Sequence, residues 1–344
     1  MCIRDSSFGV ESYSSKLFLI NSINDFYTID YNIRQQEKII LGGGTNILLK
    51  SKFISIPIFK IQIQGIEICH EKDDEVLISV GAGVNWDEFV WWCVNKNFGG
   101  IENLVSIPGN VGSAPIQNIG AYGKEVNDVI DSCEGIFIKN LEKKTFKNPD
   151  CNFGYRSSIF KKELKNEFAI TKVNFILKKN NHKIISNYSS VLSALKKRQI
   201  SHPSIKDIAQ IVKEIREKKL PDYNELGNAG SFFKNPVIDN KKFERLCSRF
   251  DDIPYYEFTH NLIKVPAAWL IEMCGFKKTK FNNVGVHKNQ SLVIINLGNA
   301  KGIDIFSFSQ RIKESVYKKF DILLEEEVTA VSYTHLTLPT TPYV

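Results

Sequence analysis

Residues 107–123 read IPGNVGSAPIQNIGAYG, a segment with four glycines among small and polar residues. Few structural loops need so many glycines together with Ser113, Gln117 and Asn118. Glycine lets a ligand lie against bare backbone, and neighbouring amide groups can hydrogen-bond to its edge. Long loops inside compact domains are usually functional. The segment therefore predicts a ligand site, with a glycine-rich connector as the plain alternative.

A second glycine-rich segment precedes it. Residues 41–46 read LGGGTN and follow the apolar run 38–41. Successive backbone N–H groups in such a turn form an anion nest that suits a pyrophosphate. The spacing matches neither the dinucleotide fingerprint nor a P-loop, and a tight turn between strands explains it equally well. Two glycine loops on opposite sides of a β-rich block indicate an extended, dinucleotide-sized ligand.

The composition limits the class of protein. With 344 residues the chain is long enough for two or three domains, and 43% hydrophobic with 24% charged residues is typical of a soluble protein. We find no apolar run that could span a bilayer and no secretory signal in residues 1–6. The seven cysteines form no C-x-x-C pair, so we expect reduced thiols, a cytoplasmic location and no metal site.

The net charge of +7 admits two interpretations, a nucleic-acid surface or a cleft for a small anion. The basic residues are spread along the chain and form no known nucleic-acid signature. We therefore expect a small anionic ligand and no nucleic-acid partner.

Helix and strand signals are mixed along the chain, which predicts an α+β fold. One helix begins after the N-cap Asn85 and ends at Gly99. Another begins after Ser204 and ends before Pro221, and a third covers 266–275. A last helix places Phe308, Ile312, Val316 and Phe320 on one face. Strands are expected at 38–41, 47–49, 76–80, 136–138, 173–177 and 292–295.

The two ends depart from the Lys/Asn/Ile-rich usage of the rest of the chain. We expect residues 1–6 and 329–344 to be non-native and exclude them from the fold. The chain would then lack a closing strand after Val328.

Three further segments could carry chemistry. Residues 153–161 read FGYRSSIFK, where Arg156 could clamp a carboxylate or could be a surface salt-bridge partner. Residues 227–236 read GNAGSFFKNP, and this open backbone could project Ser231 as a proton donor or let its hydroxyl cap Phe232 and Phe233. No Asp/His pair supports a hydrolase triad there. Residues 323–328 read LLEEEV, which is also compatible with a solvated charge run.

Taken together and in their order along the chain, the five segments resemble those of the UDP-N-acetylenolpyruvoylglucosamine reductase (MurB) family. The resemblance runs from Ser7 to Val328, and the stretch 181–201 indicates the longer subtype. It implies a two-part FAD-binding fold of the vanillyl-alcohol-oxidase type over 7–66 and 67–203. An α+β substrate-binding domain would follow over 204–328.

The resemblance also assigns ligand-binding residues. FAD would be held by Gly42, Gly43, Gly44, Thr45, Asn46, Pro108, Gly109, Ser113, Gly120 and Ala121. The nucleotide-sugar substrate would contact Tyr155, Tyr188, Arg216, Lys219, Asn235 and Gln290. NADPH would be the co-substrate.

The implied reaction reduces the enolpyruvyl group of UDP-N-acetylglucosamine enolpyruvate to give UDP-N-acetylmuramate for peptidoglycan synthesis. Arg156 and Glu327 would stabilise the developing enolate, and Ser231 would protonate it. Glu327 is chosen over the two glutamates before it because it directly precedes a valine. The resemblance further implies a monomer that does not insert into a membrane.

Two other functions remain open. A flavoprotein oxidase or dehydrogenase of the same fold would keep both glycine loops but would not need the 227–231 loop. A nucleotide-binding regulator would not need Arg156, Ser231 and Glu327.

Overall fold

The computed structural model describes residues 2–3 and 6–332. Of the ends expected to be non-native, residues 1, 4–5 and 333–344 lie outside the described residues. The chain forms two compact units. Unit 1 combines Met1–Lys16, Asn46–Pro57 and Leu226–Val344, and unit 2 combines Leu17–Thr45 and Ile58–Glu225.

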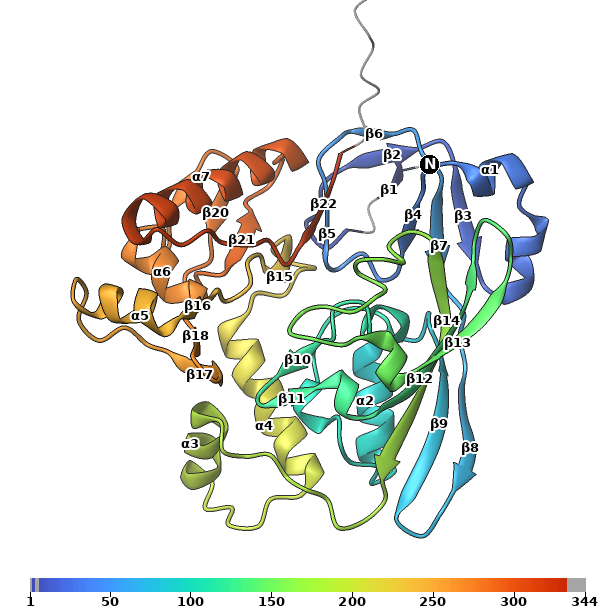
Figure 1. The fold of residues 1–344 in the computed structure, drawn as a ribbon, viewed down its shortest axis with the longest axis horizontal. Coiled ribbons are helices and arrows are strands. Elements are labelled where there is room, and N and C mark those ends of the chain that lie inside the picture. The colour runs from blue at the N-terminus through green and yellow to red at the C-terminus, as the bar shows by residue number, and fades with distance from the viewer. Residues whose placement is uncertain (1, 4–5, 333–344) are drawn as a thin grey trace, which may run out of the picture. The chain divides into compact units, whose positions relative to one another are not determined.

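Unit 2 is built on a five-stranded antiparallel sheet with the strand order β13-β12-β14-β9-β8 (Figure 1). These strands are β8 (Ile66–Glu71), β9 (Glu75–Gly81), β12 (Ile130–Phe137), β13 (Lys143–Lys147) and β14 (Phe168–Lys178). A parallel sheet, β3-β7-β4, contains β3 (Leu17–Ile20), β4 (Ile39–Leu41) and β7 (Ile58–Ile61). A two-stranded hairpin contains β10 (Gly120–Ala121) and β11 (Lys124–Glu125). The helices are α1 (Tyr31–Gln35), α2 (Trp86–Asn95), α3 (Ser189–Lys197) and α4 (Ile205–Lys219).

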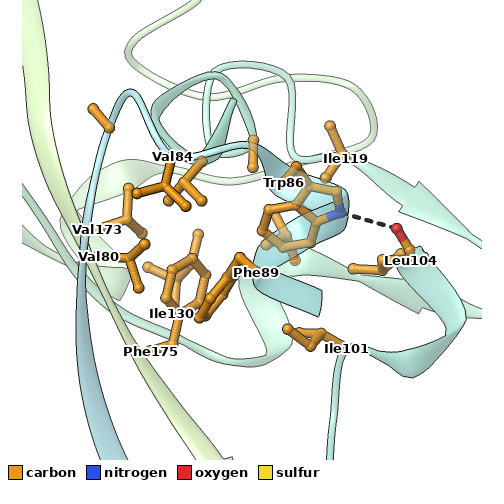
Figure 2. Packing of buried hydrophobic residues seen from close by; sticks show 14 of the residues in the cluster. Val80, Val84, Trp86, Phe89, Ile101, Leu104, Ile119, Ile130, Val173 and Phe175 are labelled. Atoms are coloured by element: carbon orange, nitrogen blue, oxygen red, sulfur yellow. Dashed lines mark hydrogen bonds between the residues drawn. The ribbon is translucent and has the colours of Figure 1, made fainter. Parts of the chain in front are cut away.

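Helix α2 forms where the sequence predicts it. The Asn85 side chain accepts a hydrogen bond from the Glu88 amide and so caps the first turn. The predicted apolar face is buried, and Trp86 and Phe89 lie inside the core that Figure 2 shows. The Trp86 indole Nε1 donates to the Leu104 carbonyl at 2.9 Å, which ties the helix to the loop that follows it.

Helix α4 is also confirmed, because Ser204 and Asp207 form the predicted capping box. Its apolar residues join the same core as α2 and the five-stranded sheet. Helix α4 therefore belongs to unit 2, although the sequence placed residue 204 at the start of the last domain. The division into 7–66, 67–203 and 204–328 stays a prediction, and its boundaries differ from those of the two units.

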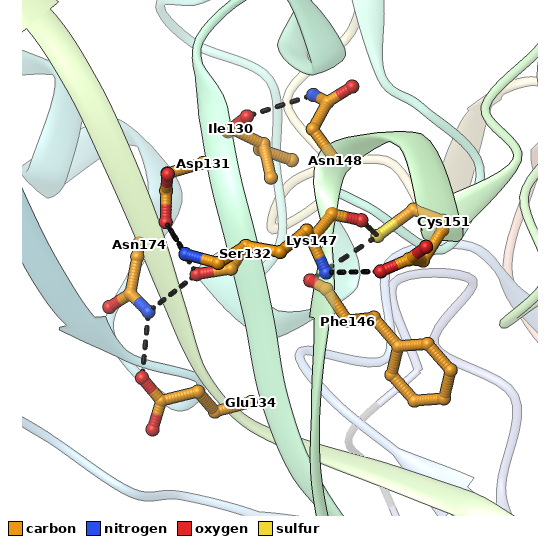
Figure 3. A network of polar contacts seen from close by, with 10 residues as sticks. Ile130, Asp131, Ser132, Glu134, Phe146, Lys147, Asn148, Cys151 and Asn174 are labelled. Atoms are coloured by element: carbon orange, nitrogen blue, oxygen red, sulfur yellow. Dashed lines mark hydrogen bonds and ion pairs between the residues drawn. The ribbon is translucent and has the colours of Figure 1, made fainter.

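Polar residues on the sheet of unit 2 are paired with one another (Figure 3). The Asn174 amide donates to the Ser132 hydroxyl at 2.9 Å and to the Glu134 carboxylate at 2.7 Å. Lys147 forms an ion pair with Asp131 at 3.1 Å. These contacts join β14 to β12 and β12 to β13, so they hold the sheet together.

The described residues of unit 1 form four small sheets. Two of them, β1-β2-β6 and β22-β5, contain β1 (Cys2–Ile3), β2 (Ser12–Ser14), β5 (Ile47–Leu49), β6 (Phe53–Ile54) and β22 (Thr329–Val331). The sheet β15-β21-β20-β19 contains β15 (Asn228–Ser231), β19 (Lys280–Phe281), β20 (Val284–Val286) and β21 (Val293–Asn296). The sheet β16-β18-β17 contains β16 (Val237–Asp239), β17 (Tyr256–Thr259) and β18 (Leu262–Lys264). The helices are α5 (Asn240–Cys247), α6 (Ala267–Met273) and α7 (Gly302–Phe320).

Strand β22 corrects one expectation, that a closing strand after Val328 is missing. Residues 329–331 form this strand and pair in parallel with β5, while their non-native origin stays a prediction. Thr329 lies opposite Ile47 and Val331 opposite Leu49, and the Lys50 amide donates to the Val331 carbonyl at 2.9 Å. A threonine and a valine suit an extended strand, so the segment closes unit 1 after Val328.

Helix α7 buries the predicted face of Phe308, Ile312, Val316 and Phe320. No helix in the part of the chain that the structure describes is both long enough and apolar enough to cross a membrane.

The start of α7 gives a first prediction. A Cβ atom on Gly302 would lie 1.8 Å from the Leu49 carbonyl oxygen, and this backbone atom cannot rotate away. Gly302→Ala should therefore lower the free energy of unfolding by about 3 kcal/mol. Urea unfolding of this variant is compared with Gly154→Ala, whose Cβ has its nearest neighbour at 3.9 Å. Equal midpoints for both variants would contradict the close packing of α7 on β5.

Candidate functional site

The two glycine-rich segments predicted to bind one ligand lie against each other in unit 2. A Cβ on Gly42 would lie 2.2 Å from the Ser113 hydroxyl, and a Cβ on Gly43 would lie 2.8 Å from the Asn110 Oδ1. The Thr45 hydroxyl donates to the Pro108 carbonyl at 3.1 Å. There is no room for side chains at these glycines, so the loops approach each other through bare backbone.

The second loop is fixed by the connection between β9 and α2. The Trp86 amide donates to the Gly109 carbonyl, and the Val111 amide donates to the Val84 carbonyl, each at 2.9 Å. Gly109 has a φ of +127° and Gly44 a φ of +70°, which glycine adopts without strain. The loops thus offer backbone amides together with the Ser113 hydroxyl, while the Thr45 hydroxyl already donates to Pro108. This donor set fits the phosphates of a dinucleotide cofactor.

Arg156 contacts the far end of the same loop. Its Nη2 donates to the Gly120 carbonyl at 2.7 Å and its Nη1 to the Asn118 carbonyl at 3.4 Å. The guanidinium carbon also lies 5.5 Å from the centre of the Tyr155 ring. Ala121 follows Gly120 in the β10–β11 hairpin. The structure therefore brings Arg156 and Tyr155 next to the predicted cofactor residues Gly120 and Ala121.

Three predicted substrate residues gather around the start of this loop and around Tyr122. The Arg216 Nε donates to the Ser106 carbonyl at 3.2 Å. Desolvation lowers the pKa of the Arg216 guanidinium below its ordinary value. The nearby Tyr122 hydroxyl, to which Arg216 is hydrogen-bonded, offsets only part of this effect. The Tyr122 ring packs edge-on against Tyr188, with centroids 5.3 Å apart. The pKa of Lys219 is lowered mainly because the ammonium group is partly desolvated, and also because it is repelled by the positive charge of Arg216.

Tyr122 and Asn118 were not among the predicted site residues. Asn118 is fully buried, and its Oδ1 accepts from the Asn127 amide at 3.1 Å. Tyr122 and Asn118 have φ values of +48° and +45°. Their position in a glycine-rich segment was the one sequence feature that could have indicated a role in the site. The residues that hold them come from distant segments.

In unit 1, the predicted proton-donor loop is held at its start. A Cβ on Gly227 would lie 2.3 Å from the Phe8 carbonyl oxygen, and the Asn228 amide donates to the Ser7 carbonyl at 2.9 Å. Gly230 has a φ of +67°, and the register between β15 and β21 shifts before Ser231. The Ser231 hydroxyl forms no hydrogen bond within residues 2–3 and 6–332, so it remains available to a ligand.

The acidic segment runs antiparallel to the residues after Ser231. Phe233 pairs with Glu326, and the Glu327 amide donates to the Phe232 carbonyl at 2.8 Å. The predicted residues Ser231 and Glu327 therefore lie on neighbouring backbone segments.

The other two glutamates have structural partners. Glu325 forms an ion pair with Lys234 at 2.9 Å, and Glu326 forms one with Lys313 at 2.8 Å. Gln310 also donates to Glu326 at 2.9 Å. These contacts tie Glu325 and Glu326 to the fold, and the choice of Glu327 as the functional residue stays a prediction.

Glu326 gives a prediction of pH dependence. Burial raises its pKa, but hydrogen bonds from Lys313 and Gln310 outweigh burial and leave the pKa below its ordinary 4.5. The carboxylate therefore adds stability above pH 4.5, and this stability is lost as the pH falls through the lower folded-state pKa. Because the pair is partly exposed, Glu326→Gln should cost about 0.5 kcal/mol at pH 7 and less at a pH well below 4.5. Urea unfolding at both pH values measures this, and an equal loss at both would contradict it.

The two remaining predicted substrate residues are held by unit 1. The Asn235 Oδ1 accepts from the Ala267 amide at 2.9 Å, at the start of α6. The Gln290 Oε1 accepts from the Leu292 amide at 3.3 Å. In both side chains, the amide oxygen thus accepts a hydrogen bond from the backbone of unit 1.

The predicted site residues fall into two groups. Unit 2 contains Gly42, Gly43, Gly44, Thr45, Pro108, Gly109, Ser113, Gly120, Ala121, Tyr155, Arg156, Tyr188, Arg216 and Lys219. Unit 1 contains Asn46, Ser231, Asn235, Gln290 and Glu327. Within the described residues, no group of three or more His, Cys, Asp or Glu side chains could hold a metal ion.

Comparison with known proteins gives two family matches. Residues 31–138 match an FAD binding domain, and residues 221–331 match the UDP-N-acetylenolpyruvoylglucosamine reductase C-terminal domain. A solved structure, the UDP-N-acetylenolpyruvylglucosamine reductase of Thermus caldophilus, shares the fold with a TM-score of 0.66. It is 20% identical, and the match covers 95% of each chain. The expected α+β class, with an FAD-binding fold followed by a C-terminal domain, is confirmed.

Several relatives match over most of the chain. UDP-N-acetylenolpyruvoylglucosamine reductase of Flavobacterium johnsoniae is 46% identical over 326 residues, which cover 95% of this chain and 96% of the relative. The enzyme of the same name from Aliivibrio fischeri is 40% identical and covers 94% and 91%. The one from Amoebophilus asiaticus is 42% identical and covers 86% of each. The chain belongs to the UDP-N-acetylenolpyruvoylglucosamine reductase family of FAD-dependent oxidoreductases.

Proposed function

We propose that this protein uses NADPH to reduce the enolpyruvyl group of UDP-N-acetylglucosamine enolpyruvate, giving UDP-N-acetylmuramate for peptidoglycan synthesis. The observation that carries the proposal is the pairing of the 325–327 segment with the residues after Ser231. It brings the Ser231 hydroxyl, which has no hydrogen-bond partner among the described residues, and Glu327 to neighbouring positions. The relatives' name supports the substrate.

The residues of the chain have separate roles in this reaction. The carbon–carbon double bond gains a hydride, which comes from NADPH, and a proton. Ser231 delivers the proton to one carbon, while Arg156 and Glu327 stabilise the negative charge that develops toward the carboxylate. A serine hydroxyl is a weak acid, so the step requires a strongly basic enolate and a site without bulk water.

FAD fits the glycine loops of unit 2. When bound, it supplies a carrier for the hydride between the two substrates. Gly42, Gly43, Gly44 and Thr45 would hold its pyrophosphate together with Gly109 and Ser113, because their amides and the Ser113 hydroxyl form the donor set described above. The same loops would be kept by an oxidase or dehydrogenase, but the Ser231 loop favours the reductase.

The test separates the two halves of the reaction. The purified protein should be yellow, NADPH should bleach it, and the enolpyruvyl substrate should restore the colour. A colourless protein that takes up no FAD would rule out the flavoenzyme. A yellow protein whose colour returns with other substrates but not with this one would favour the alternative. A cytoplasmic location and a monomeric state stay predictions.

A further inference from the structure

We infer that Asn46 is a positioning residue for Glu327, in addition to any contact it makes with the cofactor. This inference rests on the proposed function, in which Glu327 stabilises the enolate. The resemblance assigned Asn46 to FAD together with the glycines before it. In the structure, Asn46 also makes two hydrogen bonds to the backbone around Val328.

Asn46 contacts the acidic segment on both sides of Val328. Its side-chain Nδ2 donates to the Glu327 carbonyl at 3.1 Å. Its own carbonyl accepts from the Thr329 amide at 3.0 Å. Strand β5 begins at Ile47, directly after Asn46, and β22 begins at Thr329, so Asn46 lies where their parallel pairing starts.

The Glu327 residue is therefore held from two directions. Its amide donates to Phe232, directly after Ser231, and its carbonyl accepts from Asn46. Both contacts are made through the backbone, which leaves the carboxylate to other partners. A residue fixed at both its amide and its carbonyl has little backbone freedom, so the direction of its Cα–Cβ bond, from which the carboxylate extends, is set before a substrate binds.

The neighbouring Glu326 provides a control for the hydrogen bond between Asn46 and Glu327. Glu326 is held through its side chain by Lys313, on α7. Loss of Lys313 would loosen the same segment without removing the hydrogen bond to the Glu327 carbonyl. Lys313→Met is therefore a matched control for general loosening.

The test compares Asn46→Ala and Asn46→Asp with wild type in the FAD-loaded protein. Alanine removes the donor, and aspartate keeps the shape but places an oxygen against the Glu327 carbonyl. We expect kcat to fall about ten- to hundredfold, with FAD affinity and bleaching by NADPH retained. Lys313→Met should stay near wild type. If the alanine variant does not fold, the aspartate variant provides the measurement.

A double-mutant cycle distinguishes positioning from an independent role. In a Glu327→Gln background, Asn46→Ala should cause no further loss of kcat, because the carboxylate that it positions is already gone. Full additivity of the two losses would overturn the inference. So would a rise in the FAD dissociation constant with kcat unchanged, since that is the behaviour of a cofactor ligand only.

Amide hydrogen exchange provides a readout that does not depend on turnover. The peptide 325–332 should exchange faster in Asn46→Ala than in wild type, while a peptide over β21 should not change. Unchanged exchange in 325–332 would overturn the inference. If the wild-type protein does not reduce the enolpyruvyl substrate, the proposed function fails, and this exchange measurement still tests whether Asn46 holds the Glu327 segment.

Discussion

Ser231→Ala is expected to leave bleaching by NADPH nearly intact and to slow the return of colour by the enolpyruvyl substrate about 10²- to 10⁴-fold. The Ser231 hydroxyl has no hydrogen-bond partner in the described residues, so its loss leaves no protein group unsatisfied. The variant should therefore fold normally. Only the step that needs a proton at the substrate carbon loses its donor. Stopped-flow measurement of the two half-reactions separates these effects.

The matched control is Ser309→Ala, which removes a buried hydroxyl from the same unit. The Ser309 hydroxyl donates to the Phe306 carbonyl at 2.7 Å inside α7. Its loss should cost about 1 kcal/mol of stability and leave both half-reactions intact. Equal slowing of both half-reactions in Ser231→Ala would contradict the proton-donor role, as would an unchanged rate of colour return.

The local elements of the fold could be predicted from the sequence, because their signals lie within a few residues. Asn85 before α2 and the Ser204–Asp207 box before α4 mark helix starts, and both caps form in the structure. The apolar face of α7 follows from the spacing of Phe308, Ile312, Val316 and Phe320. These are interactions across a single helical turn, which a local pattern can show.

Long-range pairings could not be predicted in the same way. Thr329 pairs with Ile47, and the Gly227 backbone lies against Phe8, in each case across more than two hundred residues. Nothing near Thr329 indicates which strand it joins, so the sequence suggested a missing strand where β22 forms. The assignment of α4 to unit 2 depends likewise on a core shared with distant strands.

The candidate site was predictable as a set of segments but not as a set of contacts. The glycines at 42–44 indicated close backbone approach, and the structure shows that Ser113 and Asn110 are what they approach. Arg216 was expected to contact the substrate, and the structure adds that it donates to the Ser106 carbonyl and is hydrogen-bonded to the Tyr122 hydroxyl. Residue type indicates what a side chain can bind, and only the fold determines which partner is in reach.

Gly43→Val should empty the flavin site while the protein stays folded. A Cβ at this position would lie 2.8 Å from the Asn110 Oδ1 and 3.1 Å from the Gly109 Cα, and valine adds two methyl groups beyond it. Gly43 does not have a positive φ, so the effect comes from lost space and not from backbone strain. Separating the two glycine loops should raise the FAD dissociation constant at least about hundredfold, which corresponds to about 2.8 kcal/mol.

Titration with FAD, followed by flavin fluorescence, measures this change, and circular dichroism reports the fold. Gly154→Val is the control, because the nearest atom to its Cβ is 3.9 Å away and FAD affinity should be retained. Gly42→Ala should have a smaller effect than Gly43→Val, since its Cβ would meet the Ser113 hydroxyl, which can rotate away. The expected loss of FAD affinity is therefore largest for Gly43→Val, smaller for Gly42→Ala and absent for Gly154→Val, according to how easily the neighbouring atoms can move. Full FAD occupancy in folded Gly43→Val would place the pyrophosphate away from these glycines.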